Sequence, residues 1–468
     1  MFNNIVNIAM IFFQRKIFFL NLTRLYLLVK YSGMQAGLLS CILIVFSCNN
    51  NESTATQADK KKEVEIKKEN GVYRFFKNGA PLLIKGAVGH TNVADLVACG
   101  GNTLSVWDTS IVEKILDEAL KYKVNVIVGL DIPSGDLVEF YKDEKKVTEL
   151  FNAHKSTVER FKNHPALLAW GLGNELVMPF TSNSSAFYKT CNKLLKMMHT
   201  EDPDHPVTTT IINLQKGSII NINWKIRDLD FISINTYNKL KDIKQKLKKL
   251  SLVWNGPYLI SEWSPNGGWE SETTVWQAPI ENTSTKKAEQ YYKFYAEYMP
   301  KDDPRFLGSL AFYWGNRQEY THTWYSVFNE DGSPTEIKEA LRDGWKDTLT
   351  QHQSVKIKYM LIDNHGARDN IILSPGSKHD ISLLLADDQK SDSLHYSWQL
   401  LKEDWLYWGR TWNNFKKPPA LGGLISDSAL QNTKFICPSK EGPYRIFITV
   451  YNSKGFCATA NTPFYVVK

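Results

Sequence analysis

The sequence predicts an α/β fold, in which a (β/α)8 barrel is preceded by a β-hairpin and followed by an all-β sandwich. Between residues 83 and 313, eight short apolar runs of strand length alternate with longer amphipathic stretches, which is the pattern of parallel strands joined by helices. Eight such units in about 250 residues match the size of a (β/α)8 barrel. After residue 355 the helical stretches stop, and short strand-like runs separated by turn residues indicate a sandwich.

The first 48 residues are expected to direct export rather than to fold. Residues 34–47 form an apolar run that is too short to span a bilayer and is typical of a signal peptide. The run ends in Val45-Phe46-Ser47-Cys48, which resembles a bacterial lipobox, so Cys48 is the expected site of lipidation. The polar residues 49–63 indicate a tether. Translation is expected to start near Met34, and the alternative is a genuine N-terminal membrane helix.

The hairpin and the barrel follow in order. Gly71–Phe76 and Pro81–Ile84 are strand formers on either side of an Asn-Gly pair, which is a strong hairpin signal. Helical patterns within the barrel, residues 64–348, include Ile111–Lys123 and Val147–Lys162. The alternative, a doubly wound open sheet, is disfavoured because Gly86–His90 is a poor match to a phosphate-binding glycine turn. The eight barrel strands are expected at Leu83–Ala87, Thr103–Trp107, Val124–Leu130, Leu167–Gly171, Val207–Ile211, Phe231–Ile234, Tyr258–Ser261 and Ser309–Tyr313.

The last domain, residues 355–468, is predicted to be an immunoglobulin-like sandwich. Strand-like runs occur at Ile381–Leu385, His395–Leu400 and Tyr444–Tyr451. Cys437 and Cys457 both fall in this domain, and a disulfide between them is left open, because spacing alone does not establish one. The six cysteines form no CxxC pair and no Cys/His cluster, which argues against a structural zinc site.

The net charge of +7 does not indicate a nucleic-acid partner. The lysines are scattered or lie on one amphipathic stretch, Lys239–Lys249, which is typical of the solvated face of a helix. No basic stripe alternates with aromatic residues. We therefore expect no nucleic-acid partner and membrane contact only through the lipid anchor. That anchor predicts a location in the bacterial cell envelope, at the outer membrane or in the periplasm.

Two glutamates follow buried strands at places where a barrel concentrates function. The fourth strand leads into Gly173-Asn174-Glu175, and the seventh leads into Ser261-Glu262-Trp263. Active sites of such barrels lie at the carboxyl ends of the strands, and desolvating a carboxylate is costly unless it has a partner or a function. Retaining glycoside hydrolysis needs two carboxylates about 5–5.5 Å apart. The alternative for either glutamate is a helix cap or an ion-paired residue at the rim.

These two motifs together resemble glycoside hydrolase clan A, which includes the family 2, family 5 and family 72 barrels. The resemblance covers about residues 70–346. It implies that Glu175 is the acid/base and Glu262 the nucleophile, and that Asn174 binds the sugar 2-hydroxyl. It also implies that Tyr237, after the sixth strand, hydrogen-bonds the nucleophile. Trp314, after the eighth strand, would form the aromatic floor of the subsite in which the cleaved sugar binds.

Other residues at strand ends are weaker candidates for sugar binding. Polar contacts are expected from His90, Asp131 and Asn235, and Asp108 is as well explained by a helix cap as by a ligand contact. Trp107 and Trp263 are expected either to stack against sugar rings or to belong to the core. The loop after the eighth strand offers three further polar residues, Asn316, Glu319 and His322.

One departure from the clan pattern concerns the second strand. Clan members commonly carry an arginine there that hydrogen-bonds the nucleophile, and Ser105 occupies that place in this chain. Without a nearby cation the pKa of Glu262 is expected to rise, because opposite charge favours the ionised carboxylate. Arg317 is predicted to reach the pocket and to replace part of the charge. The alternative is a surface arginine paired with Glu319.

The sequence therefore predicts a retaining glycosidase that acts on a β-linked oligo- or polysaccharide by double displacement, without metal or organic cofactor. A transglycosylase on the same scaffold, a non-catalytic glycan-binding lipoprotein and a structural subunit of an outer-membrane assembly are the alternatives. The missing arginine favours the binding protein among them. The sandwich is expected to be a spacer or an accessory glycan contact, so that deleting it would leave some activity on small substrates.

Overall fold

The computed structural model describes residues 62–386, 393–404 and 416–468. The predicted export segment, Cys48 and nearly all of the tether therefore lie outside the described residues. Within the described part of the chain, no helix is both long enough and apolar enough to cross a membrane.

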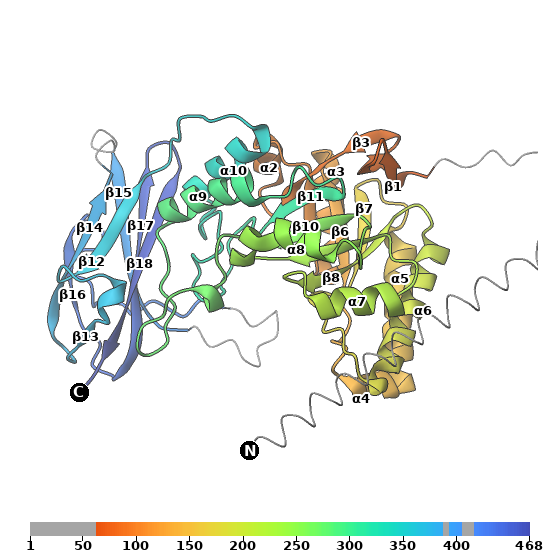
Figure 1. Ribbon diagram of the computed structural model, residues 1–468. Helices are drawn as coiled ribbons and strands as arrows, with labels where there is room; N and C mark the ends of the chain where they lie inside the picture. Colours follow the sequence, from red (N-terminus) through yellow and green to blue (C-terminus); the bar gives the residue numbers. More distant parts are fainter. Residues whose placement is uncertain (1–61, 387–392, 405–415) are drawn as a thin grey trace, which may run out of the picture. The chain divides into compact units, whose positions relative to one another are not determined.

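The barrel is closed and consists of eight parallel strands that neighbour one another in chain order (Figure 1). All eight predicted strands are confirmed. The last begins at Phe306 rather than Ser309 and ends at Ala311 rather than Tyr313, so the aromatic residues after it belong to a loop. The strands are β4 (Ile84–Val88), β5 (Thr103–Val106), β6 (Asn125–Leu130), β7 (Leu167–Leu172), β8 (Val207–Ile212), β9 (Phe231–Asn235), β10 (Tyr258–Trp263) and β11 (Phe306–Ala311).

Helices surround the barrel because each has one apolar face. In α3 (Val112–Lys121), Ile115, Leu116 and Ala119 are buried, at the i, i+1 and i+4 spacing that places residues on one side of a helix. The apolar faces of the other helices likewise pack against the outside of the barrel strands, and together they form one continuous core. These helices are α2 (Val93–Ala98), α4 (Val138–Lys142), α5 (Glu144–Phe161), α6 (Ser185–Glu201), α7 (Lys216–Lys225), α8 (Ile243–Leu250), α9 (Ser284–Lys293) and α10 (Glu336–Lys346).

A three-stranded antiparallel sheet covers the amino-terminal end of the barrel. It contains the predicted hairpin, β2 (Val72–Lys77) and β3 (Ala80–Leu82), with Asn78 and Gly79 both at positive φ in the turn. A further strand, β1 (Val64–Glu69), pairs with β2 and was not predicted. The ring of Phe75 meets that of Phe231 edge-on, 5.4 Å between centroids, at the start of β9. The sheet therefore lies at the end of the barrel opposite the carboxyl ends of the strands.

The C-terminal residues form two β-sheets that share an apolar core, as the sequence predicts (Figure 1). One sheet has the order β12 (Ile357–Ile362), β14 (Lys378–Leu385), β16 (Thr433–Ile436), and the other has the order β13 (Ile372–Leu373), β18 (Cys457–Val466), β17 (Gly442–Asn452), β15 (Leu394–Lys402). Cys437 and Cys457 are buried free thiols, so the disulfide that the sequence left open is not formed.

Candidate active site

A cavity of about 610 Å³ opens at the carboxyl ends of the barrel strands. Both glutamates line it, together with side chains that follow five of the eight strands. Its walls include Val88, Gly89, His90, Ser105, Trp107, Asp108, Thr109, Asp131, Asn174, Glu175, Glu262, Phe312, Tyr313 and Arg317. The position agrees with the rule that the function of such barrels gathers at this end.

Glu175 is presented to the cavity by an unusual backbone turn. After β7 the chain passes through Gly173 at φ 76° and places Glu175 itself at φ 51°. This left-handed conformation is uncommon for a residue with a side chain, and such strain is found most often at functional sites. The carboxyl oxygen Oε1 accepts a hydrogen bond from Asn235 Nδ2 at 3.1 Å. Burial raises the pKa of Glu175, and the Asn235 bond opposes that rise.

Glu262 lies on β10 and is almost completely buried, at 7% exposure. Its Oε2 accepts a hydrogen bond from the Tyr237 hydroxyl at 3.3 Å, as expected from the clan resemblance. Burial raises the pKa of Glu262 strongly, and the negative charge of Glu175 adds to the rise. The charge of Glu175 thus disfavours ionisation of Glu262, so protonation of the two carboxyl groups is linked.

Asn235 supports both motifs from behind the cavity wall. It is 1% exposed and does not line the cavity. Its Nδ2 donates to Asn174 Oδ1 at 3.2 Å as well as to Glu175, and its Oδ1 accepts from Ser261 Oγ at 2.8 Å. Asn235, a predicted sugar contact, thus holds two residues that line the cavity, Asn174 and Glu175. Tyr237 likewise contacts Glu262 without belonging to the cavity lining.

Arg317 reaches the cavity and is also ion-paired, so both expectations for it hold in part. Its guanidinium lies 5.5 Å from the ring centroid of Phe312 and 5.6 Å from that of Tyr313. Its Nε donates to Glu319 Oε2 at 2.6 Å, and the side chain is only 16% exposed. The charge of Arg317 lowers the pKa of Glu262, whereas Glu319 raises it. Arg317 therefore replaces only part of the charge that Ser105 does not supply.

Trp107 forms a wall of the cavity, as the sequence suggested. The indole lies against Gly129 on β6 and Gly171 on β7. A Cβ atom at Gly129 would lie 2.1 Å from the nearest indole carbon, so any larger residue would displace the ring. The flat indole is therefore held in place by glycines on two neighbouring strands, and it offers an aromatic surface to a ligand.

Three predicted polar residues line the cavity at its rim: His90, Asp108 and Asp131. The predicted cap at Asp108 is confirmed, because its carboxylate accepts from Ser110 N at 3.0 Å at the start of a short 3-10 turn. Burial lowers the pKa of His90 and raises that of Asp131, because it disfavours the charged form of each side chain. The oxygen and nitrogen atoms of these three side chains can form hydrogen bonds with the hydroxyls of a sugar.

Two tryptophans belong to the core: Trp314, which was expected at the substrate, and Trp263, for which the core was one of the two expectations. Trp314 is fully buried between Phe328 and Trp345, at centroid distances of 5.1 and 5.8 Å. Trp263 is fully buried against Tyr291 and Tyr295 outside the strands. The reason for Trp263 is the alternation of side chains along a strand: Glu262 points inward, so its neighbour points outward.

The aromatic residues that do line the cavity after the eighth strand are Phe312 and Tyr313. Both fall inside the predicted strand Ser309–Tyr313, so neither was predicted as a cavity residue. The aromatic run Phe312-Tyr313-Trp314 indicated that a side chain there would reach the cavity. Deciding which of the three does so requires knowing that β11 ends at Ala311. Asn316 and His322 also lie away from the cavity: Asn316 Nδ2 donates to the backbone oxygen of His322 at 3.2 Å, and His322 is 3% exposed.

Comparison with known proteins agrees with this geometry. Residues 115–307, which include both glutamates, match the family model described as glycosyl hydrolases family 2, TIM barrel domain. The resemblance to this group and the predicted fold class are thereby confirmed. The comparison with curated proteins finds no match.

Matches among the solved structures include two longer chains and one of similar length. Bacteroides uniformis β-glucuronidase 2, bound to cyclophellitol-6-carboxylate aziridine, has 14% identity and a TM-score of 0.47, and the match covers 86% of this chain and 48% of that one. A putative β-galactosidase from Bacteroides fragilis has 13% identity and a TM-score of 0.45 over 86% and 57% of the two chains. The endo-β-1,4-mannanase from Thermotoga petrophila has 12% identity and a TM-score of 0.40 over 84% and 99%. The chain thus spans about half the length of the β-glucuronidase.

Proposed function

We propose that the protein is a retaining β-glycosidase in which Glu175 is the acid/base and Glu262 the nucleophile. The observation that carries the proposal is the pair of carboxylates from the fourth and seventh barrel strands, which line one cavity and both have raised pKa values. Two coupled carboxylates facing one cavity are the equipment of glycoside hydrolysis. The family 2 match of the barrel supports the same reaction class.

The proposed reaction has two steps. Glu262 attacks the anomeric carbon while Glu175 transfers its proton to the leaving glycosidic oxygen, which gives a glycosyl ester on Glu262 and a free alcohol. Glu175, now ionised, takes a proton from water, and the resulting hydroxide attacks the anomeric carbon and releases Glu262. Net retention of configuration follows from two inversions.

The proposed roles require an ionised Glu262 and a protonated Glu175. Glu262 accepts a hydrogen bond from the Tyr237 hydroxyl and interacts with the positive charge of Arg317, and both interactions stabilise its ionised form. Glu175 accepts one amide hydrogen bond from Asn235, and the charge of Glu319 adds to the rise in its pKa that burial causes. Burial and the charge of Glu175 nevertheless raise the pKa of Glu262 to about 8, so the proposed roles need a bound substrate to place the proton on Glu175.

The substrate class follows from the walls of the cavity. Trp107 and Tyr313 offer aromatic surfaces, and His90, Asp108 and Asp131 offer polar groups at the rim. A pyranose has apolar C–H faces and a belt of hydroxyls, so this combination suits a sugar ring. We propose a β-linked oligo- or polysaccharide as the substrate.

The test is a screen of the purified protein against aryl β-glycosides and β-linked glucans, with Glu175→Gln as the control. NMR identifies the anomer that is formed first. A first product with the substrate's own configuration, together with loss of turnover in Glu175→Gln, would establish a retaining enzyme. A first product of inverted configuration, or turnover that survives in both Glu175→Gln and Glu262→Gln, would refute the proposal. Sugar acceptors added to the same assay would identify transglycosylation by the appearance of longer products.

A non-catalytic glycan-binding protein is the second candidate, and a specific observation favours it. Ser105 leaves the second strand without a cation, and the Arg317 charge is shared with Glu319. Calorimetry with the oligosaccharides of the screen separates the two: binding without any turnover in the wild type would favour the second candidate.

We also propose that Cys48 carries a lipid and anchors the protein in the bacterial cell envelope. The support is the lipobox-like run before Cys48 and the polar stretch after it. Membrane fractionation of cells that express the wild type and Cys48→Ala would test it, since the variant is expected to leave the membrane fraction.

A further inference from the structure

The loop after β11, residues 316–328, is held together by its own hydrogen bonds. The backbone N–H of Arg317 donates to Ser326 Oγ at 2.9 Å, and Ser326 Oγ donates to the carbonyl oxygen of His322 at 2.8 Å. The N–H of Glu319 donates to the carbonyl oxygen of Thr321 at 3.0 Å. Because the Arg317–Ser326 bond joins the two arms of the loop and Ser326 also bonds to His322, we expect displacement of the tip, residues 321–323, to displace Arg317.

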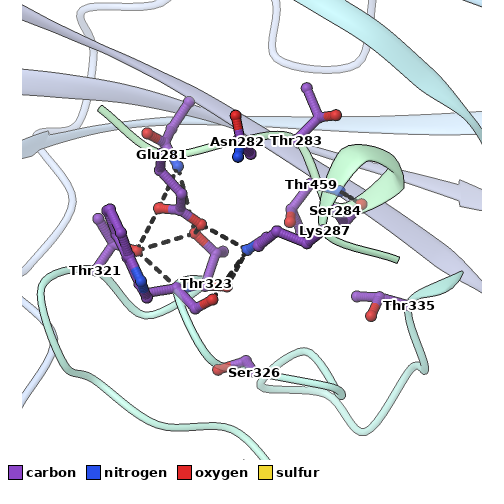
Figure 2. Close-up of polar contacts among 12 residues, drawn as sticks. Glu281, Asn282, Thr283, Ser284, Lys287, Thr321, Thr323, Ser326, Thr335 and Thr459 are labelled. Carbon is purple, nitrogen blue, oxygen red and sulfur yellow. Dashed lines mark hydrogen bonds and ion pairs between the residues drawn. The ribbon is translucent and has the colours of Figure 1, made fainter. Parts of the chain in front are cut away.

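The tip is fixed by Glu281, which precedes α9 (Figure 2). Glu281 accepts from Thr321 Oγ1 at 2.6 Å, from Thr323 Oγ1 at 2.8 Å and from Lys287 Nζ at 2.8 Å. The Glu281 side chain is only 1% exposed, yet its pKa is lowered, because the charge and hydrogen bond of Lys287 and the Thr321 hydroxyl outweigh the effect of burial. A buried, ionised carboxylate thus accepts hydrogen bonds from both threonine hydroxyls of the loop tip.

The sandwich supplies the remaining partner of Glu281. Asn461 on β18 donates from Nδ2 to Glu281 Oε2 at 2.7 Å. Arg445 on β17 fixes Asn461 in turn: its Nη1 donates to Asn461 Oδ1 at 2.6 Å, and its Nε pairs with Glu403 at 2.9 Å. The His322 ring also lies 4.5 Å from that of Phe447 on β17. β17 therefore contacts the tip of the loop that carries Arg317, and β18 is connected to it through Glu281.

We propose that Asn461 and Glu281 are positioning residues, through which the C-terminal sandwich holds Arg317 beside the catalytic cavity. The sandwich would then be part of the active site and more than the spacer that the sequence suggests. The catalytic consequence rests on the proposed function, because Arg317 matters for turnover through the ionisation of Glu262. The anchoring itself does not depend on any activity.

The experiment compares two variants of the full chain with a matched control. Thr321→Val removes one hydroxyl from the network with little change of volume, and Asn461→Ala removes the link from the sandwich. The control is Ser284→Ala, which removes the hydrogen bond from the Thr459 N–H to Ser284 Oγ, 2.9 Å. That bond also joins the sandwich to the barrel, but it does not contact the loop (Figure 2).

Hydrogen exchange followed by mass spectrometry gives the first readout. Peptides covering residues 316–328 are expected to exchange faster in Thr321→Val and Asn461→Ala than in Ser284→Ala. Equal exchange in all three variants would overturn the anchoring, whatever the activity of the protein. If only Asn461→Ala fails to fold, Thr321→Val alone decides this comparison.

The second readout is the acid limb of the pH profile, which reports the ionisation of Glu262. In the two network variants it is expected to move to higher pH by about half a unit to one unit, because a displaced Arg317 stabilises the carboxylate less. The same limb is obtained from the pH dependence of binding of a cationic iminosugar, which needs the ionised carboxylate but no turnover. Faster loop exchange with an unmoved limb would refute the positioning role, whereas a protein without turnover that shows both shifts would refute only the proposed function.

Discussion

Replacing Ser105 by arginine is the most informative change to the candidate site. Ser105 lies on β5 between Val88 of β4 and Ile127 of β6, is 5% exposed, and lines the same cavity as Glu262. The clan resemblance puts a cation at this place, and the observed Arg317 supplies only a shared charge. We expect the new guanidinium to restore an opposite charge beside the nucleophile.

The size of the effect follows from Coulomb's law. Two opposite charges about 5 Å apart interact by about 3 kcal/mol at an effective dielectric constant of about 20. That energy corresponds to about two pKa units, and the open side of the cavity together with the existing Arg317 reduces the expected shift to about one unit. A cation favours the ionised form, so the pKa of Glu262 falls. The acid limb of kcat/KM therefore moves to lower pH, and activity on that limb rises about tenfold.

The assay is the pH profile of kcat/KM on an aryl β-glycoside, with Ser105→Met as a control of similar bulk without charge. The reasoning would be refuted if the acid limb of Ser105→Arg coincided with that of the wild type, or if Ser105→Met moved it equally. In a protein without turnover, iminosugar binding replaces the rate measurement. Turnover gained in Ser105→Arg would mean that the chemistry was latent.

Three further predictions concern other residues. Glu175→Gln should lower kcat by about 10²–10⁴-fold, and less for substrates whose leaving group needs no proton, as measured with a series of aryl glycosides. Trp107→Ala should lower kcat/KM by about tenfold through the loss of an aromatic contact of about 1.4 kcal/mol, whereas Trp314→Ala should lower the free energy of unfolding by about 3–5 kcal/mol without moving either pH limb. Denaturant unfolding separates the two tryptophans, and an intact stability in Trp314→Ala would contradict its assignment to the core. His352 forms hydrogen bonds with Glu336 and Asp343, and these bonds raise its pKa above the unfolded value. Its contribution to stability is therefore present below pH about 6.5 and is lost as the pH rises through the folded pKa. A plot of Tm against pH should show this decline in the wild type but not in His352→Gln.

The eight strands and the two glutamates were predictable because their signals are local. Each strand is a short apolar run between polar stretches, and Glu175 and Glu262 directly follow or end such runs. Trp314 was misplaced because the direction of a side chain in a loop depends on where the strand ends, and β11 ends at Ala311. An error of two residues was enough to choose the wrong aromatic.

The network around Glu281 was not predictable, because its members have no common pattern in the sequence. Glu281, Thr321 and Asn461 lie in three separate segments, each polar and unremarkable in its own context. They meet only because β18 of the sandwich packs on the region before α9. The strand β1 was missed for a related reason: four of its six residues are charged, and pairing with β2 rather than an apolar pattern makes it a strand.

The contact between Trp107 and Gly129 bears on how the site can change over evolutionary time. Gly129 offers no functional group, yet a single added methyl would have to share space with the indole, which lies 2.1 Å from where that methyl would be. Drift at this position is therefore coupled to drift at Trp107: a larger residue becomes tolerable only after the indole has been lost. A laboratory search for altered sugar preference would accordingly do better to randomise the two positions together than to vary either one alone.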